Sequence, residues 1–570
     1  MDVSNFPHHP SPDHYAHPSA WDTQFDLMTV PDMLERTTRA NPSAPLLHFM
    51  GWTYSYQHIY AEARRFAAGL QEMGIARGDR VGLFLPNVPI YVSAYYGAMM
   101  AGAVVVNFSP LYTVEELAWQ VEDSGTRLLV TLDVPELYGT AQAVLDGSGL
   151  ETLVVGSLAA QLPWHKGLAL RALGRSKIAS VGWNSAVRPW KEVLAEWNWS
   201  AWLEGKAPDL PSLDPAQDLA LLQYTGGTTG RPKGAMLGHS QLAMNAQQVA
   251  SINPFGNPAG EVFMGALPFF HVFANTALLN HAVVSGASIA MLPRFDAGQV
   301  LQTIAKYRAT GFPGVPTMFQ ALLDHPDITK TDLSSLKVCI SGGAPMPAPV
   351  HDKFESVTGV RVVEGYGLTE SSGVVSANPY AGKRKKGTIG QVVPGTDIIL
   401  LDKEDPERLA PDGEPGELAI HGPQIMRGYW NRPDAVAETF VEHGGRQWMR
   451  TGDVAVLDED GFLKIVDRIK DMIAVGGFKV FPSQVEDVLL ENPAVKEALV
   501  IGVPDDYLGE VPRAYVTLTE PGSTDGDALK DWLNAKIGKH ERVDQVVIRD
   551  TLPKTLIGKL DRKALRAEVL

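Results

Sequence analysis

Short apolar runs alternate with helical patterns over about the first four hundred residues of the chain. Segments such as 55–73 and 113–122 carry apolar residues at helical spacing, and Thr113 with Glu116 has the spacing of a helix-capping box. The apolar runs between such segments have the length and residue types of buried strands. Those runs are residues 81–85, 128–132, 152–155 and 337–341. Strands and helices in alternation predict parallel β-sheets covered by helices.

The pattern changes after about residue 396. Strand-like segments at 397–401, 416–422 and 462–466 are separated by turn-forming residues such as Pro411-Asp412-Gly413. This order predicts antiparallel pairing in a β-barrel-like subdomain.

The last part of the chain has the pattern of a separate, small α+β unit. Ser483 and Glu486 have capping-box spacing at the start of a helix. Strands are expected at 497–501 and 513–518, and a second helix follows with Leu529 on its inward face. The predicted fold class is therefore a multidomain protein of mixed α/β and α+β type.

We expect the chain to divide near residue 467. A flexible, His-rich arm is expected over residues 1–24, and a large domain of helix-covered β-sheets over 25–467. The β-rich subdomain of the large domain spans about 396–467. A small, mobile α+β domain then covers 468–570.

The charge and the cysteine content narrow the functional classes. The formal net charge is −16, from 65 acidic and 49 basic side chains, which argues against broad binding to nucleic acid or anionic lipid. Cys339 is the only cysteine of the sequence, so an intramolecular disulfide is excluded. The longest apolar stretch, 94–106, is shorter than the ~20 residues of a membrane-spanning helix. Because the N-terminus also lacks the features of a signal peptide, we expect a cytoplasmic protein.

A Gly/Thr-rich segment, Tyr224-Thr-Gly-Gly-Thr-Thr-Gly-Arg-Pro-Lys-Gly234, follows the strand-like run 219–222. Its glycines let backbone N–H groups approach an anion, and its hydroxyls and lysine add donors, so the loop fits the β- and γ-phosphates of ATP. No Gly-Lys-Ser/Thr closes it as in a Walker A loop, and a Rossmann fingerprint is absent. The alternative is a flexible hairpin. The candidate phosphate-binding residues are Thr225, Gly226, Gly227, Thr228, Thr229, Gly230 and Lys233.

This segment resembles the signature loop of the acyl-adenylate-forming superfamily, which includes acyl-CoA synthetases, firefly luciferase and peptide-synthetase adenylation domains. Six further motifs follow in the expected order. They are Leu267-Pro-Phe-Phe-His271, Ser341-Gly-Gly-Ala-Pro345, Glu364-Gly-Tyr-Gly-Leu-Thr-Glu370, Thr451-Gly-Asp453, Asp467-Arg468 and Gly558-Lys559. The resemblance covers about residues 25–567 and is greatest to bacterial long-chain fatty acid–CoA ligases.

The resemblance implies a two-step reaction with ATP and CoA as co-substrates and Mg²⁺ as the cofactor. A fatty carboxylate attacks the α-phosphorus of ATP, giving acyl-AMP and pyrophosphate. The CoA thiol then takes the acyl group and AMP leaves. A carboxylate is a poor electrophile, and the protein must neutralise charge and hold the reactants in line for the first step.

The catalytic residues implied by the resemblance are four. Glu370, next to Thr369, would hold Mg²⁺ at the phosphates, a role that suits a carboxylate. Lys559 would stabilise charge at the α-phosphate, and His271 would gate the acyl site and contact the carboxylate region. Taken alone, these residues would be interpreted as a loop glutamate, a surface lysine and a core histidine.

The resemblance also assigns the rest of the nucleotide site. Asp453 would accept both ribose hydroxyls, with Arg468 assisting at the ribose or the phosphate. Gly343 and Ala344 would line the adenine, and Tyr366 is a candidate for the other face of the ring. The remaining nucleotide-site candidates are Glu364, Gly365 and Gly367.

Members of this superfamily rotate the small domain between the two half-reactions. Lys470 resembles the pivot, and the rotation would withdraw Lys559 and bring Gly476, Gly477 and Phe478 to the CoA tunnel. The basic run 383–386 could meet the 3′-phosphate of CoA, or it could be a solvated loop.

The sequence defines the carboxylic acid substrate less well than it defines the nucleotide site. A long apolar chain needs a deep slot. Seven residues that could line it are Phe269, Phe270, Val272, Phe273, Phe312, Val315 and Met318. Aryl or medium-chain acids, a carrier-protein thiol as acceptor, and a luciferase-like oxidation are compatible with the same motifs. A non-catalytic nucleotide-binding regulator is the alternative from another class.

Segment 164–202 holds six of the twelve tryptophans, interleaved with basic residues. This composition is typical of a peripheral contact with a bilayer surface, here the inner face of the cell membrane. An ordinary surface insertion is the alternative. Related synthetases often form homodimers, and the sequence assigns no interface.

Overall fold

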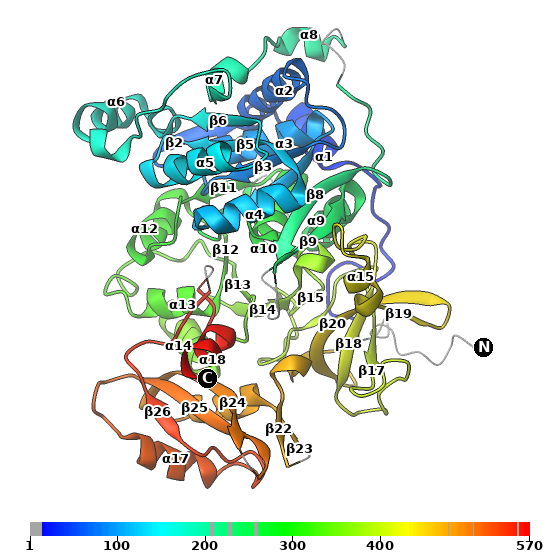
Figure 1. Cartoon of the computed structure of the whole chain (residues 1–570), viewed down its shortest axis with the longest axis vertical. Coiled ribbons are helices and arrows are strands. Elements are labelled where there is room, and N and C mark those ends of the chain that lie inside the picture. The colour runs from blue at the N-terminus through cyan, green and yellow to red at the C-terminus, as the bar shows by residue number, and fades with distance from the viewer. Residues whose placement is uncertain are drawn as a thin grey trace.

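The computed structural model describes residues 14–205, 210–225, 231–255, 260–476, 478–505, 507–555 and 558–570. Within these ranges the chain forms four β-sheets, two of them large and helix-covered and two of them small (Figure 1). The predicted fold class is confirmed.

The first large sheet has seven strands in the described part of the chain, and all neighbours pair in parallel except its last two strands. In spatial order they are β7 (Val187–Pro189), β6 (Thr152–Gly156), β5 (Thr126–Leu132), β3 (Arg80–Phe84), β4 (Val104–Phe108), β8 (Leu219–Thr225) and β9 (Lys233–Gly238). The apolar runs 81–85, 128–132 and 152–155 thus lie in neighbouring parallel strands, as predicted.

The second large sheet has nine strands within the same described ranges, with parallel pairing through its centre. In spatial order they are β16 (Gln391–Val392), β15 (Ser376–Ala377), β14 (Val362–Tyr366), β13 (Val338–Gly342), β12 (Gly311–Gly314), β10 (Val262–Gly265), β11 (Ser288–Met291), β1 (Pro45–Phe49) and β2 (Trp52–Ser55). The predicted strand 337–341 is β13, which lies between β14 and β12 beside the centre of this sheet.

Helices cover both sheets. They include α1 (Val30–Ala40), α2 (Tyr56–Glu72), α3 (Pro89–Met100), α4 (Val114–Ser124), α5 (Pro135–Gly147), α9 (His239–Ser251), α10 (Val272–Ala274), α11 (His281–Ser285), α12 (Ala297–Tyr307), α13 (Pro316–Leu323) and α14 (Ala348–Thr358). The predicted helices 55–73 and 113–122 are α2 and α4, and α4 begins with the expected capping box of Thr113 and Glu116.

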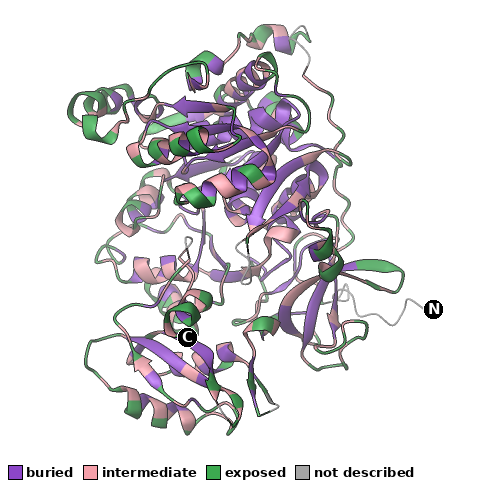
Figure 2. Ribbon diagram, in the orientation of Figure 1, coloured by how far each residue is buried: buried purple, intermediate pink, exposed green. Residues whose placement is uncertain are grey.

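The centre of the large core is α3, every residue of which is buried (Figure 2). Its tyrosines carry their hydroxyl groups to both halves of the domain. Tyr91 donates to Asn107 of β4 at 2.9 Å, whereas Tyr96 donates to Asn280, before α11, at 2.8 Å. A buried phenol needs a hydrogen-bond partner, and these bonds therefore fix the two large sheets relative to each other.

The predicted β-rich subdomain is a five-stranded antiparallel sheet. Its strands are β17 (Asp397–Leu401), β18 (Gly416–His421), β19 (Phe440–His443), β20 (Arg446–Leu457) and β21 (Leu463–Arg468), with α15 (Pro433–Thr439) before β19. The small C-terminal unit has a core of its own that begins at Ile473. Its elements are β22 (Ile473–Val475), β23 (Phe478–Val480), α16 (Pro482–Leu490), β24 (Val495–Asp505), β25 (Gly509–Leu518), α17 (Gly526–Asn534), β26 (Val546–Ile548) and α18 (Arg562–Val569).

The capping box predicted from Ser483 and Glu486 is wrong. Pro482 starts α16, so Ser483 lies inside the helix and Phe481 is the N-cap, with no side-chain cap bond. The Glu486 carboxylate instead accepts from the guanidinium of Arg562 at 2.6 Å. A charged partner from α18 outcompetes a single backbone N–H.

The N-terminal arm is only partly as expected. Residues 1–13 lie outside the described residues. Residues 14–24 pack against β16 and the chain after it, with the Tyr15 hydroxyl donating to Val392 O at 2.8 Å and the Trp21 indole donating to Thr396 O at 2.8 Å. Burial lowers the pKa of His17 to about 4. This part of the expected arm is therefore anchored, because its aromatic side chains find both apolar cover and polar partners.

Candidate active site

Lys559 reaches from the C-terminal unit to the large domain. Its backbone closes a tight turn in which Thr555 N donates to Lys559 O at 2.7 Å. The side chain lies against Gly343, at the end of β13, so that a Cβ placed on Gly343 would be 2.7 Å from Lys559 Cε and 3.0 Å from its Nζ. Gly343 also has φ +82°, a conformation that favours glycine. The glycine at this position therefore leaves space for the lysine.

Three predicted nucleotide-site residues form one hydrogen-bonded group beside Lys559. Asp453 lies in β20 and is buried, and its Oδ1 accepts from Arg468 Nε at 2.9 Å. Its Oδ2 accepts from the Tyr366 hydroxyl at 2.5 Å. Tyr366 ends β14, in the other sheet. The structure therefore brings together residues that are about a hundred positions apart in the sequence.

The electrostatics of this group act on both Lys559 and His271. Burial lowers the pKa of Lys559 to about 8, the Arg468 charge adds to that shift, and the Asp453 charge opposes it. Burial, together with the Lys559 charge, lowers the pKa of His271 to about 3. At neutral pH the histidine is consequently neutral, whereas the lysine carries a proton most of the time.

The orientation of His271 follows from its place before α10. Its Nδ1 accepts from Phe273 N at 3.3 Å. Because the neutral ring then carries its proton on Nε2, the other edge of the imidazole is a hydrogen-bond donor.

Glu370 and Lys233 both contact Tyr429, a residue that the sequence motifs did not identify. The Tyr429 hydroxyl donates to Glu370 Oε1 at 2.7 Å, and Lys233 Nζ lies 5.2 Å from the centroid of the Tyr429 ring. Glu370 and Thr369 belong to a short 3₁₀ turn (Thr369–Ser371), and Met426 N donates to Glu370 O at 2.7 Å. A single tyrosine outside the motifs carries no signal by itself, so Tyr429, which forms an isolated bridge with Ala235 of β9, could be found only in three dimensions.

The phosphate loop is described at its two ends. Thr225 ends β8 and pairs with Lys233 at the start of β9. Gly226, Gly227, Thr228, Thr229 and Gly230 lie outside the described residues. Asp123 of helix α4 anchors the β8 end of the loop. Its carboxylate accepts from the Tyr224 hydroxyl at 2.7 Å and from Arg432 at 2.6 Å. Asp123 is a second residue that the sequence did not single out.

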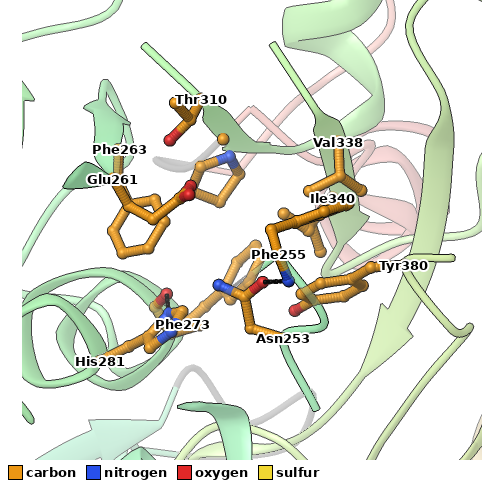
Figure 3. A pocket seen from close by; sticks show the side chains of 13 residues that line it. Asn253, Phe255, Glu261, Phe263, Phe273, His281, Thr310, Val338, Ile340 and Tyr380 are labelled. Atoms are coloured by element: carbon orange, nitrogen blue, oxygen red, sulfur yellow. Dashed lines mark hydrogen bonds between the residues drawn. The ribbon is translucent and has the colours of Figure 1, made fainter. Parts of the chain in front are cut away.

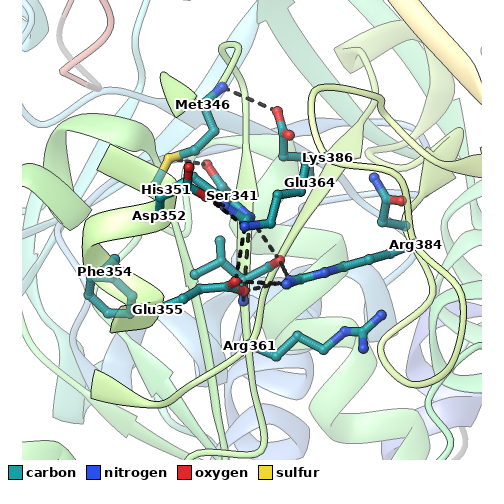
Figure 4. Close-up of polar contacts among 12 residues, drawn as sticks. Ser341, Met346, His351, Asp352, Phe354, Glu355, Arg361, Glu364, Arg384 and Lys386 are labelled. Carbon is teal, nitrogen blue, oxygen red and sulfur yellow. Dashed lines mark hydrogen bonds and ion pairs between the residues drawn. The ribbon is translucent and has the colours of Figure 1, made fainter. Parts of the chain in front are cut away.

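Glu364 supports the predicted adenine loop from behind (Figure 4). Its carboxylate accepts from Met346 N at 3.2 Å and from Gly387 N at 3.1 Å. Burial raises its pKa, and these two bonds oppose the shift. The carboxylate is thus used to fix the loop that carries Gly343 and Ala344. Gly365 lies in β14 opposite Ala377, and Gly367 follows directly after the same strand.

The basic run 383–386 is occupied by ion pairs within the protein. Arg384 binds Glu355 at 2.5 Å, and Lys386 binds Asp352 at 2.6 Å (Figure 4). The other two lysines of the run bind Asp458 and Asp460. These pairs favour the interpretation as a structural surface loop over a site for CoA.

A cavity of about 30 Å³ lies behind the adenine loop (Figure 3). Phe273 lines it and also lies 3.0 Å from the position that a Cβ on Gly342 would take. Phe273 and Lys559 therefore contact neighbouring glycines of one loop. The complete lining is Asn253, Phe255, Glu261, Phe263, Phe273, Ala277, His281, Thr310, Gly311, Pro313, Val338, Ile340 and Tyr380.

The slot predicted from the sequence differs from this cavity. Of the seven residues expected to line it, only Phe273 lines the cavity. Phe269 and Phe312 are fully buried in the core instead. None of the residues of the motif 267–271 lines this cavity, and sequence spacing could not show which side chains turn toward the space.

The predicted CoA-tunnel turn lies apart from Lys559, whereas the predicted pivot Lys470 lies near the charges of Arg468 and Asp453. Lys470 belongs to a 3₁₀ turn (Ile469–Asp471) directly after β21. Gly476 forms the turn between β22 and β23, at the end of the C-terminal unit away from the large domain (Figure 1). Gly477 lies outside the described residues, as does the side chain of Phe478. This arrangement places Lys559, and not the β22–β23 turn, at the site.

Comparison with known proteins identifies the fold and the chemistry. Residues 34–430 match the AMP-binding enzyme family, and residues 484–559 match the AMP-binding enzyme C-terminal domain. The ATP-bound crystal structure of MatB from Rhodopseudomonas palustris superposes with a TM-score of 0.80 at 28% identity, covering 95% of this chain and 99% of that chain. The anthranilate CoA ligase AuaEII in complex with anthranoyl-AMP superposes with a TM-score of 0.81 at 25% identity, covering 95% and 98%.

Curated relatives match over nearly the whole chain. A long-chain-fatty-acid–CoA ligase of Bacillus subtilis (strain 168) is 36% identical over 541 residues, or 95% of this chain and 94% of the relative. The feruloyl-CoA synthase of an Amycolatopsis species is 33% identical over 533 residues, or 93% and 97%. These names support AMP-forming acid–CoA ligase chemistry, with ATP and CoA as substrates. The chain belongs to the AMP-binding enzyme family of acyl-adenylate-forming proteins.

Proposed function

We propose that this protein is a long-chain fatty acid–CoA ligase that forms a fatty acyl-AMP and then transfers the acyl group to the thiol of CoA. The observation that carries the proposal is the position of Lys559. It lies on the glycine loop whose other side faces the cavity behind Phe273, and it is beside the Asp453–Arg468–Tyr366 group. Neighbouring glycines of one loop therefore contact Phe273 of the apolar lining on one side and Lys559, beside the residues that we propose bind the nucleotide, on the other.

In the adenylation step, the residues of this surface would hold ATP and neutralise developing charge. Asp453, buried and fixed by two donors, is oriented to accept from the ribose hydroxyls. Lys559 would place its ammonium group at the α-phosphate, where negative charge builds up as the carboxylate attacks. Its pKa of about 8 leaves it charged at neutral pH, and burial strengthens its interaction with an anion.

His271 would position the acid. Its Nε2–H, left free to donate by the Nδ1 bond to Phe273 N, can bind a carboxylate or phosphate oxygen. With a pKa of about 3 it does this as a neutral group at physiological pH. A neutral donor orients the attacking carboxylate without taking up its charge, and the carboxylate remains nucleophilic.

The residues fit a bound Mg²⁺ of the kind that depends on a nucleotide. Among the described residues, no three His, Cys, Asp or Glu side chains gather into a metal cage. Magnesium usually takes one or two carboxylates and completes its shell with water and substrate phosphates. Glu370, held by Tyr429 next to the phosphate-loop lysine Lys233, would supply that carboxylate. When bound, the ion would neutralise phosphate charge.

For the thioester step we propose that the C-terminal unit rotates about Lys470. The described ion pairs that join it to the rest of the chain include Lys496–Asp324 at 3.3 Å and Lys479–Glu404 at 3.2 Å, both on the surface. Exposed pairs of this kind contribute about 0–1 kcal/mol each. Their weakness allows Lys559 to leave and the Gly476 turn to approach the site. We place the domain boundary between the large core, which includes Ile465, and the small core, which begins at Ile473.

The acid is assigned from the relatives, because a cavity of about 30 Å³ has room for a water molecule and not for an acyl chain. The cavity lining is mostly apolar, and relatives named long-chain-fatty-acid–CoA ligase match 94–95% of the chain. An aryl acid is the second candidate, since four aromatic side chains line the cavity and feruloyl-CoA synthase is a relative.

The test is a panel of acids from acetate to oleate, with ferulate and benzoate, assayed with Mg·ATP with and without CoA. The proposal predicts AMP and acyl-CoA in equal amounts, with the highest kcat/KM for acids of about twelve carbons or more. A preference for the aryl acids would replace the fatty acid by the second candidate. Activation without thioester would overturn CoA as the acceptor.

A further inference from the structure

Asp467 is a motif residue to which the proposed reaction assigns no role. It lies in β21, where it pairs with Val454 of β20, and it is only 3% exposed. Its Oδ2 accepts from Ser483 N, in the first turn of α16, at 2.8 Å. Strand β21 is part of the five-stranded sheet of the large domain, whereas α16 packs into the core of the C-terminal unit. This cross-hinge bond therefore joins the two units on either side of Lys470.

Helix α16 lacks a side-chain cap from its own N-cap residue. Phe481 occupies that position, and its side chain makes no cap bond. An N-cap side chain normally accepts from the N–H of the second or third helical residue, and Ser483 is the second residue of α16. Asp467 thus supplies, from the other side of the pivot, a bond that many helices obtain from their own chain. Its negative charge also suits the N-terminal end of a helix dipole.

Arg562 adds a second interaction across the pivot. Its guanidinium is bound within the C-terminal unit by Asp471 at 3.0 Å and by Glu486 at 2.6 Å. Its charge also acts on Asp467, because burial raises the pKa of Asp467 and the Arg562 charge opposes that shift. Arg562 follows Lys559 closely in the sequence. The attraction between Arg562 and Asp467 therefore acts on the segment that carries the lysine.

We propose that Asp467 is a positioning residue that holds the C-terminal unit in the orientation in which Lys559 reaches the site. The inference rests on the proposed rotation about Lys470. That rotation carries Ser483 away, while the pairing with β20 keeps Asp467 in the large domain. The cross-hinge bond is consequently made in the adenylation orientation only. It contributes to the equilibrium between this orientation and the rotated one.

The size of the contribution follows from the cost of losing a helix cap. Replacing an N-cap aspartate by alanine changes an equilibrium constant by about two- to thirtyfold. In the rotated orientation the Ser483 N–H bonds to water, as the free N–H groups of other helix ends do. Asp467→Ala should therefore destabilise the adenylation orientation alone. The C-terminal unit itself should stay folded, because Arg562 keeps both of its carboxylate partners there.

Single-molecule energy transfer in the full-length protein measures the orientation directly. Dyes are placed at Thr329→Cys and Glu520→Cys, two exposed sites, one in each unit. Cys339 is buried, so labelling is confined to the introduced cysteines. Without substrates, Asp467→Ala should lower the ratio of molecules in the adenylation orientation to rotated molecules by about two- to thirtyfold. Asp467→Asn keeps an acceptor oxygen, and its ratio should stay within about threefold of the wild-type ratio.

Asp525→Ala is the matched control. Asp525 is the N-cap of α17, which has nine residues, as α16 does, and its Oδ1 accepts from Ala528 N at 2.8 Å. Because this cap lies entirely within the C-terminal unit, its loss should lower the Tm of that unit and leave the orientation ratio unchanged. With substrates, Asp467→Ala should slow acyl-AMP formation, and transfer from synthetic acyl-AMP to CoA should be equal or faster. A merely structural role would slow both half-reactions.

Four results would overturn the proposal. They are an unchanged orientation ratio in Asp467→Ala, an equal shift in Asp525→Ala, a ratio in Asp467→Asn as low as in the alanine variant, and equal slowing of both half-reactions. The ratio is measured without substrates, so its outcome is separate from the ligase assignment. A protein that activates no acid but shows the predicted shift would refute the proposed function and leave the role of Asp467 in place.

Discussion

The contact between Gly343 and Lys559 gives a quantitative prediction for Gly343→Ala. The new Cβ would be 2.7 Å from Lys559 Cε, whereas ordinary contact begins at 3.4 Å, so the lysine must move by about 0.7 Å. A misplacement of about 1 Å can cost about 10²-fold in rate. We therefore expect acyl-AMP formation to fall roughly 10- to 100-fold, or about 1.4–2.7 kcal/mol. Conversion of synthetic acyl-AMP and CoA to acyl-CoA should change little, because the proposed rotation withdraws Lys559 from the site in that step.

Backbone strain is separated from the contact by two controls. Gly343 has φ +82°, and an alanine there costs about 1–2 kcal/mol of stability whatever it touches. Gly359 has φ +69° with nothing within 4 Å, so Gly359→Ala carries the strain without the contact and should leave adenylation unchanged. In the Lys559→Ala background, Gly343→Ala should lower the residual adenylation rate much less than in the wild type. An equal effect in both backgrounds would refute the contact as the cause.

Three further predictions concern the same site. The kcat/KM of adenylation should fall as the pH rises through about 8, because Lys559, whose lowered pKa is about 8, loses its proton there, and a profile flat to pH 10 would contradict its role as a charged group. If the cavity behind Phe273 widens to take the acyl chain, Ala277→Leu, which fills it with side-chain volume, should lower kcat/KM for palmitate by about tenfold more than for hexanoate, and equal losses would exclude this region as the acyl site. Asp123→Asn should raise the KM for ATP about three- to tenfold, with acyl-CoA formation from acyl-AMP unchanged as the internal control, because Tyr224 and Arg432 lose a charged acceptor.

Local sequence signals predicted the elements well where a residue acts on its own neighbours. Thr113 and Glu116 form the expected capping box, and the apolar runs are the expected strands. The same signal failed at Glu486, because Arg562, far away in sequence, offers a stronger partner. The length of the flexible N-terminal arm was overestimated, because Tyr15 and Trp21 donate hydrogen bonds to the chain around β16, which is far away in sequence.

The candidate site was predicted through motifs, and its supporting residues were not. The motifs located Asp453, Tyr366 and Lys559, which the structure brings together, although their roles stay predictions. Tyr429 and Asp123 were missed, because a single tyrosine or aspartate becomes informative only when the fold places it against another site residue. The exposure of Trp164 and Trp183 was also hidden, since the sequence could not separate them from the four tryptophans of segment 164–202 that pack inward.

The central claim is that the carboxylate attacks the α-phosphorus of ATP, and transfer of isotope tests it most directly. A fatty acid labelled with ¹⁸O in its carboxylate is incubated with the protein, Mg·ATP and CoA, and the nucleotide products are analysed by mass spectrometry. Attack at the α-phosphorus forms an acyl–O–P bond, and the thiol later breaks the bond between the acyl carbon and that oxygen. The account therefore predicts one ¹⁸O in AMP and none in pyrophosphate. Label in inorganic phosphate with release of ADP, or unlabelled AMP, would contradict it.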